Sequence, residues 1–392
     1  MNRDDAPQDM LTAARFSTAA IFFANGAVFG SWVSRIPEVQ SSLGIGEGVL
    51  GLALLAMAVG ALAAMPATGW AVARYGSRTP TIVSMVVLCL ILPLMSVAPG
   101  AALLGASLFL FGIFHGSTDV SMNAQAATIE SGYGRSIMSS FHALFSFGGL
   151  AGAALGGGLA ALGVGVTQHF VSATLIFGVV AMIASRWLLP AAADAQGSGP
   201  AFALPDKALA ALGVVAFCAL VSEGAMADWS AVYLRDVIGS GPGVAAAGYA
   251  AFSLTMAIGR LTGDRFIELL GPVAMLRIGG ALAALGLAVV LVDGLGLALV
   301  GFAAIGAGLA TLFPITLSTA ARAPGMAPGA GIAAMASTGY LGFLIGPPLI
   351  GFTAELVGLR GALSLIVVAG LAIFLLAGNV VRVGETGKNA KG

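Results

Sequence analysis

Residues 48–72 read GVLGLALLAMAVGALAAMPATGWAV, a run without one charged side chain. About 20 apolar residues are enough for a helix to cross a bilayer, so this run predicts a membrane-spanning helix. The whole chain has the same character: 58% of its 392 residues are hydrophobic and 9% are charged. A soluble protein carries about 25% charged residues to cover its surface. The chain is therefore predicted to be an integral membrane protein.

Twelve apolar stretches of this kind follow one another along the chain, separated by short loops. They cover residues 12–35, 48–72, 79–98, 101–129, 136–163, 167–189, 208–234, 243–267, 272–292, 295–319, 329–354 and 360–382. The 57 glycines of the sequence would destabilise the helices of a soluble protein, but in lipid small residues let helix backbones pack closely. The sequence therefore predicts an all-α fold of twelve transmembrane helices.

The charges and the cysteines exclude several classes of function. The chain has 17 basic and 17 acidic residues and no basic run, which argues against a nucleic-acid partner. Cys89 and Cys218 lie in apolar runs without the spacing of metal ligands, so no metal site is predicted. The G-x-x-x-x-G-K-[ST] phosphate loop is missing from the sequence, so we expect no ATP and no cofactor.

The distribution of Lys and Arg predicts how the helices are oriented. If both termini are cytoplasmic, only Arg35, Arg235 and Arg360 fall on the outer side. Cytoplasmic loops of membrane proteins carry the excess of positive charge. The cytoplasmic set is then Arg3, Arg15, Arg74, Arg78, Arg135, Arg186, Lys207, Arg260, Arg265, Arg277, Arg322, Arg382, Lys388 and Lys391. We expect a multi-pass protein of the bacterial cytoplasmic (inner) membrane with both termini in the cytoplasm.

Short motifs recur after about half the length of the chain. Asn25-Gly26-Ala27 returns as Glu223-Gly224-Ala225, shifted by 198, and the MAVG of residues 57–60 returns as MAIG at residues 256–259, shifted by 199. This repeat predicts two six-helix halves, residues 1–189 and residues 208–392 with a short cytoplasmic tail. Residues 190–207, rich in Ala, Gly and Pro, are predicted to form a cytoplasmic linker between them.

Twelve helices in two parallel halves, with both termini inside, is the arrangement of the major facilitator superfamily. Residues 69–78, GWAVARYGSR, resemble the signature of that family between helices 2 and 3, G-x-L-a-D-R-x-G-R-R, with Ala73 in place of the usual aspartate. The second half has a looser copy that keeps an acid. In the family these residues latch the cytoplasmic gate, so the resemblance implies four gate candidates: Arg74, Arg78, Asp264 and Arg265. Ordinary positive-inside topology is the alternative explanation for the arginines.

Further motifs point to a branch of the superfamily. Residues 311–316, TLFPIT, resemble the Phe-Pro element of fucose-permease-like sugar:proton symporters. Residues 34–37, 119–123 and 139–142 resemble poorly characterised bacterial inner-membrane permeases related to that branch. The helix 4 arginine and the helix 5 proline that drug:proton antiporters carry are not found. In this superfamily, substrate sites lie near the bilayer midplane between the halves.

An acidic residue in the seventh apolar stretch is the first candidate for proton coupling. Glu223 lies near the predicted midplane, where a carboxylate costs roughly 2.5–3.5 kcal/mol on insertion scales. Desolvation favours its protonated form, as proton coupling requires. A structural hydrogen bond or a buried ion pair is the alternative. Asn25, its counterpart in the repeat, is a substrate-binding candidate because an amide can bind a hydroxyl or a carbonyl.

Other polar residues in apolar stretches add further candidates. His115, Asp119 and Asn123 are four residues apart and share one helical face. His115 and Asp119 are proton-coupling candidates, since imidazole titrates near neutral pH; an interhelical hydrogen-bond network is the alternative. The substrate-binding candidates, besides Asn25, are Asn123, His142, Trp229 and Tyr340.

Trp32 and Trp229 could instead be membrane-interface anchors. Asp228, beside Trp229, lies nearer the outer surface and is a further gate candidate. His169 is placed in an external loop and is assigned no role.

These features together predict a secondary active transporter of a small polar organic solute, with a sugar-like solute favoured. We expect proton-coupled uptake by alternating access, carried out by a monomer in the bilayer, and no enzymatic activity. Proton-driven export of a metabolite or drug is the alternative. A membrane-embedded hydrolase lacks an evident nucleophile–base pair here, and a nutrient sensor would need a long tail or a soluble domain.

Overall fold

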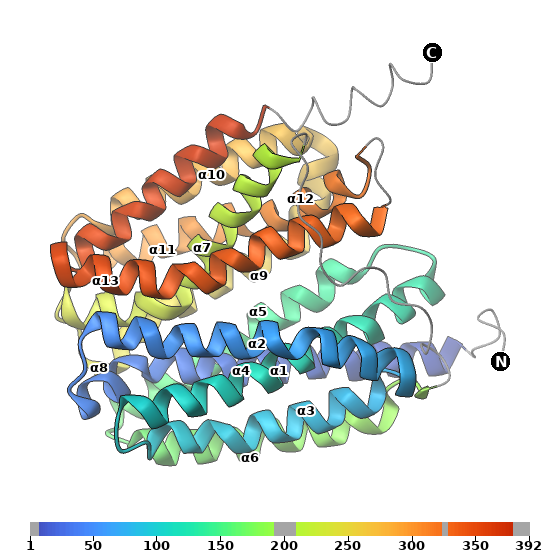
Figure 1. Ribbon diagram of the computed structural model, residues 1–392, viewed down its shortest axis with the longest axis horizontal. Helices are drawn as coiled ribbons and strands as arrows, with labels where there is room; N and C mark the ends of the chain where they lie inside the picture. Colours follow the sequence, from blue (N-terminus) through green and yellow to red (C-terminus); the bar gives the residue numbers. More distant parts are fainter. Residues whose placement is uncertain (1–7, 192–208, 324–327, 379–392) are drawn as a thin grey trace. The chain divides into compact units, whose positions relative to one another are not determined.

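The structure is a computed structural model that describes residues 8–191, 209–323 and 328–378. Within these ranges the regular secondary structure is entirely helical, and no strand occurs (Figure 1). The described part of the chain therefore confirms the predicted all-α class. The cytoplasmic linker predicted at residues 190–207 lies outside the described residues except for 190 and 191. The predicted cytoplasmic tail, which follows Arg382, also lies outside the described residues.

The described residues form two compact units. The first contains residues 8–191 and Gly241–Ala250, and the second contains residues 209–240 and 251–378. The first unit holds α1 (Gln8–Leu43), α2 (Glu47–Tyr75), α3 (Arg78–Ile91), η1 (Leu92–Ser96), α4 (Ala101–Tyr133), α5 (Met138–Ala161), α6 (Val166–Ala184), η2 (Ser185–Trp187) and α8 (Pro242–Ala245). The second holds α7 (Ala210–Asp236), most of α9 (Ala247–Leu270), α10 (Pro272–Val290), α11 (Leu295–Leu309), α12 (Leu312–Ala320) and α13 (Pro328–Leu376).

Eleven helical segments of the described chain are long and apolar enough to cross a membrane. The longest of them, in α13, is a merger of two helices. Gly358 has φ 75° and ψ 159°, which are not helical values and which residues with a side chain rarely adopt. The break falls between the predicted stretches 329–354 and 360–382, so within the described residues the eleven segments correspond to the twelve predicted helices.

The first helix is longer than its apolar stretch. The stretch 12–35 ends at Arg35, but α1 continues to Leu43 and passes through Pro37. Proline has no N–H group and removes one bond of the helix ladder. The helix nevertheless persists, and it carries Arg35 inside the element rather than at its end.

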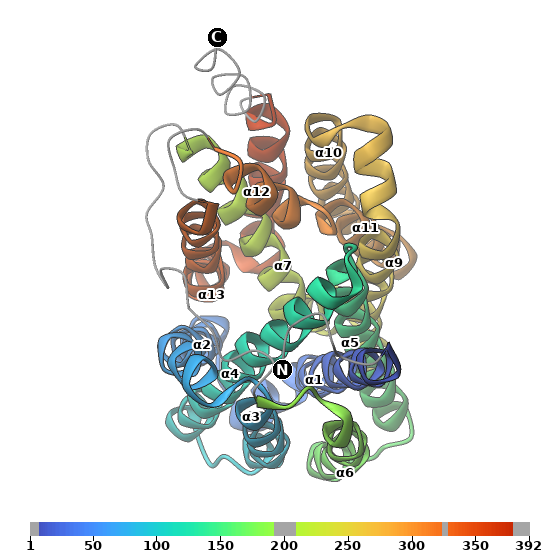
Figure 2. The ribbon, with the colours of Figure 1, turned by 90° about the vertical axis from the view of Figure 1, so that its right-hand side faces the viewer.

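Glycines set the contact between α1 and α5, which lie side by side in the first unit (Figure 2). A Cβ atom built on Gly26 would collide with the backbone of Phe145, and one built on Gly152 would collide with the backbone of Ala27. Small residues permit such close backbone contact between helices in lipid. The same feature occurs in the second unit, where a Cβ on Gly342 of α13 would lie 2.7 Å from the carbonyl oxygen of Phe217 on α7.

Candidate functional site

A hydrogen bond between α1 and α4 joins two of the predicted site residues. Nδ1 of His115 lies 3.1 Å from Oδ1 of Asn25, and Asn25 is fully buried. A carbonyl oxygen can only accept, so Nδ1 of His115 carries the proton and a neutral imidazole keeps Nε2 as an acceptor. Nδ2 of Asn25 lies 3.7 Å from the sulfur of Met122. Sequence spacing had grouped His115 with Asp119, whereas this bond connects it to another helix.

Aromatic rings surround the imidazole of His115. The rings of Phe29 and Phe111 lie nearly parallel to it, with centroids 5.2 and 6.0 Å away. The ring of Phe145 is tilted, with its centroid at 6.1 Å. The polar pair therefore lies among flat apolar faces.

The next two turns of α4 carry a second polar pair. Nδ2 of Asn123 donates to Oδ1 of Asp119 at 3.1 Å and to the carbonyl oxygen of the same residue at 2.9 Å. Both side chains are half-buried. On α5, the ring of His142 meets Phe22 of α1 edge-on at 5.5 Å. The expected meeting of His142 with Asn123 stays a prediction.

In the second unit, Glu223 has a basic partner. Nη2 of Arg260 on α9 lies 3.1 Å from Oε1 of Glu223 on α7. The side chains are 15% exposed for Arg260 and 23% exposed for Glu223. Arg260 had been counted only among the cytoplasmic arginines. The ion pair, left open above as an alternative, is therefore present.

The two candidate aromatic side chains differ in burial. Trp229 is fully buried, like Trp32, and neither indole N–H has a hydrogen-bond partner among the described residues. Their interpretation as lipid-facing anchors at the membrane interface is wrong, because such an anchor would be exposed. Tyr340 on α13 is half-buried, and its ring is tilted against Phe343 with centroids 6.4 Å apart.

The gate candidates lie at the ends of helices. Arg74 is exposed in the last turn of α2, and Arg78 begins α3 and donates to the carbonyl oxygen of Arg186 at 3.2 Å. Between them Gly76 has φ 73°, and Gly271 after α9 has φ 81°, so both signature-like loops turn at a left-handed glycine. In the signature-like segment of the second half, Asp264 and Arg265 of α9 are both exposed.

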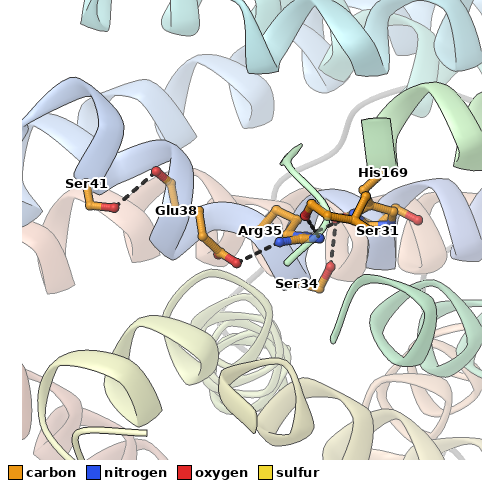
Figure 3. A network of polar contacts seen from close by, with 7 residues as sticks. Ser31, Ser34, Arg35, Glu38, Ser41 and His169 are labelled. Carbon is orange, nitrogen blue, oxygen red and sulfur yellow. Dashed lines mark hydrogen bonds and ion pairs between the residues drawn. The ribbon is translucent and has the colours of Figure 1, made fainter. Parts of the chain in front are cut away.

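Sequence reasoning missed a buried network centred on Arg35 (Figure 3). Its guanidinium donates to Oε1 of Glu38 at 3.0 Å, to Nδ1 of His169 at 3.2 Å and to the carbonyl oxygen of Val164 at 3.0 Å. Arg35 is 2% exposed and His169 is 0% exposed. The placement of His169 in an external loop is therefore wrong: it lies in α6.

The tautomer of His169 follows from this network. Arginine is always protonated, so Nδ1 of His169 must accept and a neutral ring must carry its hydrogen on Nε2. That Nε2 atom has no partner among the described residues. Gly156 makes room for the ring, since a Cβ there would lie 2.8 Å from Cε1 of His169. In the sequence, the only local indication of this network was the i,i+3 spacing of Arg35 and Glu38.

The comparisons with known proteins decide the family. Residues 16–322 match the model of the Major Facilitator Superfamily. The chain belongs to this superfamily. It is therefore a multi-pass membrane transporter rather than an enzyme, and secondary transport is its class of activity. The more specific fucose-permease-like branch stays a prediction.

Relatives and solved structures agree with this assignment. The chain is 34% identical to an uncharacterised MFS-type transporter of Yersinia pestis over 368 residues, 93% of this chain and 95% of that protein. It is 36% identical to the membrane protein MosC of Rhizobium meliloti over 370 residues, 93% and 88% of the two chains.

Two solved transporters share the fold. A mutant form of the nucleoside transporter NupG matches with a TM-score of 0.72 at 12% identity, over 96% of this chain and 99% of that one. An inward-facing bacterial homologue of the human lysosomal transporter Spinster matches with a TM-score of 0.71 at 18% identity, over the same shares. At these identities the likeness concerns the major facilitator fold alone.

Proposed function

We propose that the chain takes up a small polar organic solute, sugar-like in chemistry, by proton-coupled symport with alternating access. We place it in the bacterial inner membrane as a monomer of two six-helix halves, residues 1–189 and 208–392, with both termini in the cytoplasm. The observation that carries the proton coupling is the ion pair between Glu223 and Arg260.

An ion pair of this kind responds to protonation. In a medium of low dielectric constant two opposite charges at contact distance stabilise each other, whereas a single charge is costly. A proton that neutralises Glu223 would remove the attraction between its carboxylate and the guanidinium of Arg260. A conformation that offers Arg260 another partner would then gain population, because a ligand shifts an equilibrium by its difference in affinity for the two states. Protonation of Glu223 is in this way coupled to the conformational equilibrium of the second unit.

The chemistry around His115 supports a sugar-like solute. Nε2 of a neutral His115 can accept a hydrogen bond from a hydroxyl group, and the rings of Phe29 and Phe111 offer flat apolar faces. Asp119 and Asn123 continue the polar face of α4 over two further turns. Alternating polar and aromatic groups match a ring that has hydroxyls on its edge and C–H groups on its face.

The test begins with purified protein in a thermal-shift screen against sugars, polyols, amino acids and nucleosides. A ligand that binds only the native state raises the melting temperature. Any hit is then followed in proteoliposomes with and without an imposed pH gradient. We expect accumulation only when the outside is more acidic. Accumulation with no gradient, or only with the opposite gradient, would contradict proton-coupled uptake, and the second result would favour the exporter.

A single substitution tests whether Glu223 couples proton movement to solute transport. Glu223→Gln should lose proton-driven accumulation while solute exchange at equal pH continues, since glutamine keeps the shape and removes the titratable group. Unchanged accumulation in this variant would remove Glu223 from the coupling mechanism.

The orientation of the chain in the membrane is tested with reporter fusions. A reporter at Ser198 should lie in the cytoplasm, and reporters at Gly44 and Ser240 should lie in the periplasm.

A further inference from the structure

The side-chain amide of Asn25 on α1 makes a hydrogen bond at each of its two ends, and both partners lie on α4. Its oxygen Oδ1 lies 3.1 Å from Nδ1 of His115, and its nitrogen Nδ2 lies 3.7 Å from the sulfur of Met122. His115 and Met122 are two turns apart on the same face of α4. Asn25 is 0% exposed and Met122 is 1% exposed. The amide is therefore enclosed between its two partners.

The sulfur of Met122 determines which end of the amide faces which partner. A thioether has no hydrogen to donate and can only accept a hydrogen bond, although weakly. The nitrogen of the amide, which carries two hydrogens, can donate to it. If the amide of Asn25 were turned over, its oxygen would lie unpaired against the sulfur at a fully buried place, and folded proteins avoid unpaired buried acceptors. Met122 therefore directs the amide oxygen toward His115.

The direction of the amide fixes the tautomer of His115. The amide oxygen only accepts, so the hydrogen of the neutral imidazole is on Nδ1 and Nε2 presents a lone pair. The ring is half-buried, and within the described residues Nε2 makes no hydrogen bond. His169 is the opposite case, because Arg35 donates to its Nδ1 at 3.2 Å and its hydrogen is on Nε2. These two histidines are thus held in opposite tautomers by their neighbours.

We infer that Met122 and Asn25 are positioning residues that determine the specificity of the site at His115: the site takes a hydrogen-bond donor of the solute and rejects an acceptor. An O–H or N–H group can donate to Nε2, whereas a carbonyl, ether or carboxylate oxygen would face its lone pair. A site built to bond one group discriminates against an analogue that leaves its own polar atom unpaired. The binding of a solute at His115 rests on the proposed function, whereas the tautomer does not.

The tautomer is measured without any solute, by nitrogen-15 NMR at neutral pH on the protein in lipid bilayers with only its histidines labelled. The sequence has three histidines, and the signals that disappear in His115→Gln are those of His115. Ring nitrogens with and without a hydrogen resonate far apart, and their couplings to the ring carbons distinguish Nδ1 from Nε2. We expect the hydrogen on Nδ1 in His115 and on Nε2 in His169. A hydrogen on Nε2 of His115 would overturn the inference.

The role of Met122 is tested in the same spectrum with Met122→Leu. Leucine has nearly the volume of methionine, so the variant should fold, but it has no acceptor for the amide. The amide of Asn25 can then turn over, and we expect signals of both tautomers of His115. Met85→Leu is the matched control, because Met85 on α3 is also 1% exposed and should leave the histidine signals unchanged. A single Nδ1–H tautomer in Met122→Leu, or the same change in both variants, would contradict the role of Met122.

The specificity is tested with analogues of the solute found in the thermal-shift screen, in which one hydroxyl or amino group at a time is replaced by fluorine. Fluorine is similar in size and polarity to a hydroxyl group but donates no hydrogen bond. For the wild type we expect one position at which the replacement raises the Kd about tenfold. In Met122→Leu the same replacement should raise the Kd less, because His115 can then also donate from Nε2.

These measurements separate the inference from the proposed function, since NMR and thermal shift need no transport. If no solute accumulates in a pH gradient, the proposed function fails, while the tautomer of His115 and the Kd values of the analogues still decide the inference. If every fluorine analogue binds the wild type as tightly as the parent solute does, the selection of a donor at His115 is wrong. Proton-coupled uptake would be unaffected by that result.

Discussion

His115 and Asn25 are 90 positions apart in the sequence, yet Nδ1 of the imidazole lies 3.1 Å from Oδ1 of the amide. The bond links α4 to α1, and Asn25 is fully buried. Breaking it would leave buried polar groups unpaired, at a cost of about 1–3 kcal/mol. The bond therefore fixes the orientation of the imidazole and the direction in which its second nitrogen can accept.

Removing the amide should weaken solute binding. We expect Asn25→Ala to raise the Kd of the solute found in the screen by up to about tenfold, since one hydrogen bond contributes about 0.5–1.5 kcal/mol. Thr128→Ala is the matched control, because the side chain of Thr128 on α4 donates to the carbonyl oxygen of Ala124 in its own helix. Titration of the thermal shift measures both. If the Kd of the solute rises equally in the two variants, Asn25 has no specific role in binding.

The ion pair of Glu223 and Arg260 should show energetic coupling. In a double-mutant cycle with Glu223→Gln and Arg260→Gln, we expect a coupling free energy of about 1 kcal/mol or more in the free energy of unfolding. The control cycle uses Arg360 and Asp293, whose side chains are 42% and 79% exposed. An exposed pair contributes about 0–1 kcal/mol. If the coupling free energy of Glu223 and Arg260 is no greater than that of the control pair, their ion pair stabilises the protein no more than an exposed one does.

The contact of α1 with α5 should tolerate no side chain at Gly152. A Cβ there would collide with the carbonyl oxygen of Ala27, so Gly152→Ala should reduce the yield of folded protein and its melting temperature. Gly158, on the same helix, has no atom near its Cβ position. Gly158→Ala should therefore be neutral or stabilising by up to about 1 kcal/mol. Thermal unfolding in detergent compares the two, and equal melting temperatures would contradict the close packing.

Arg35 should be irreplaceable by lysine. A single ammonium group cannot reproduce the planar set of donors that reaches Glu38, His169 and the carbonyl oxygen of Val164. We expect Arg35→Lys to lower the free energy of unfolding by about 3 kcal/mol. Arg74→Lys, at an exposed position, should change it by less than about 0.5 kcal/mol. Similar effects of the two substitutions would show that the network adds no stability.

The gate prediction concerns the two signature-like loops. Because Ala73 stands where an acid is usual, the second loop is expected to contribute more of the cytoplasmic gate. Asp264→Asn should then slow uptake in proteoliposomes more than Ala73→Asp, which restores the usual pattern. A larger loss at position 73 would reverse the assignment.

The positions of the helices could be predicted because they depend on local composition. The stretches 329–354 and 360–382 were separated by the sequence, and the helix is broken between them at Gly358. Glu223 was identified because a carboxylate in an apolar run is conspicuous. Its partner Arg260 was not, since 37 residues separate them and only the packing of α7 against α9 brings them together. His169 had no local signal at all.

Sequence alone thus determined that this chain lies in a bilayer, how many helices cross it and which polar residues are unusual there. Transfer of a segment into lipid depends on the residues of that segment, so no tertiary contact is needed to predict it. Only the tertiary structure decided which polar groups meet: His115 with Asn25, Glu223 with Arg260, and Arg35 with His169. Those pairings depend on how each helix is rotated and how closely it packs. Both are set by contacts between residues far apart in the chain.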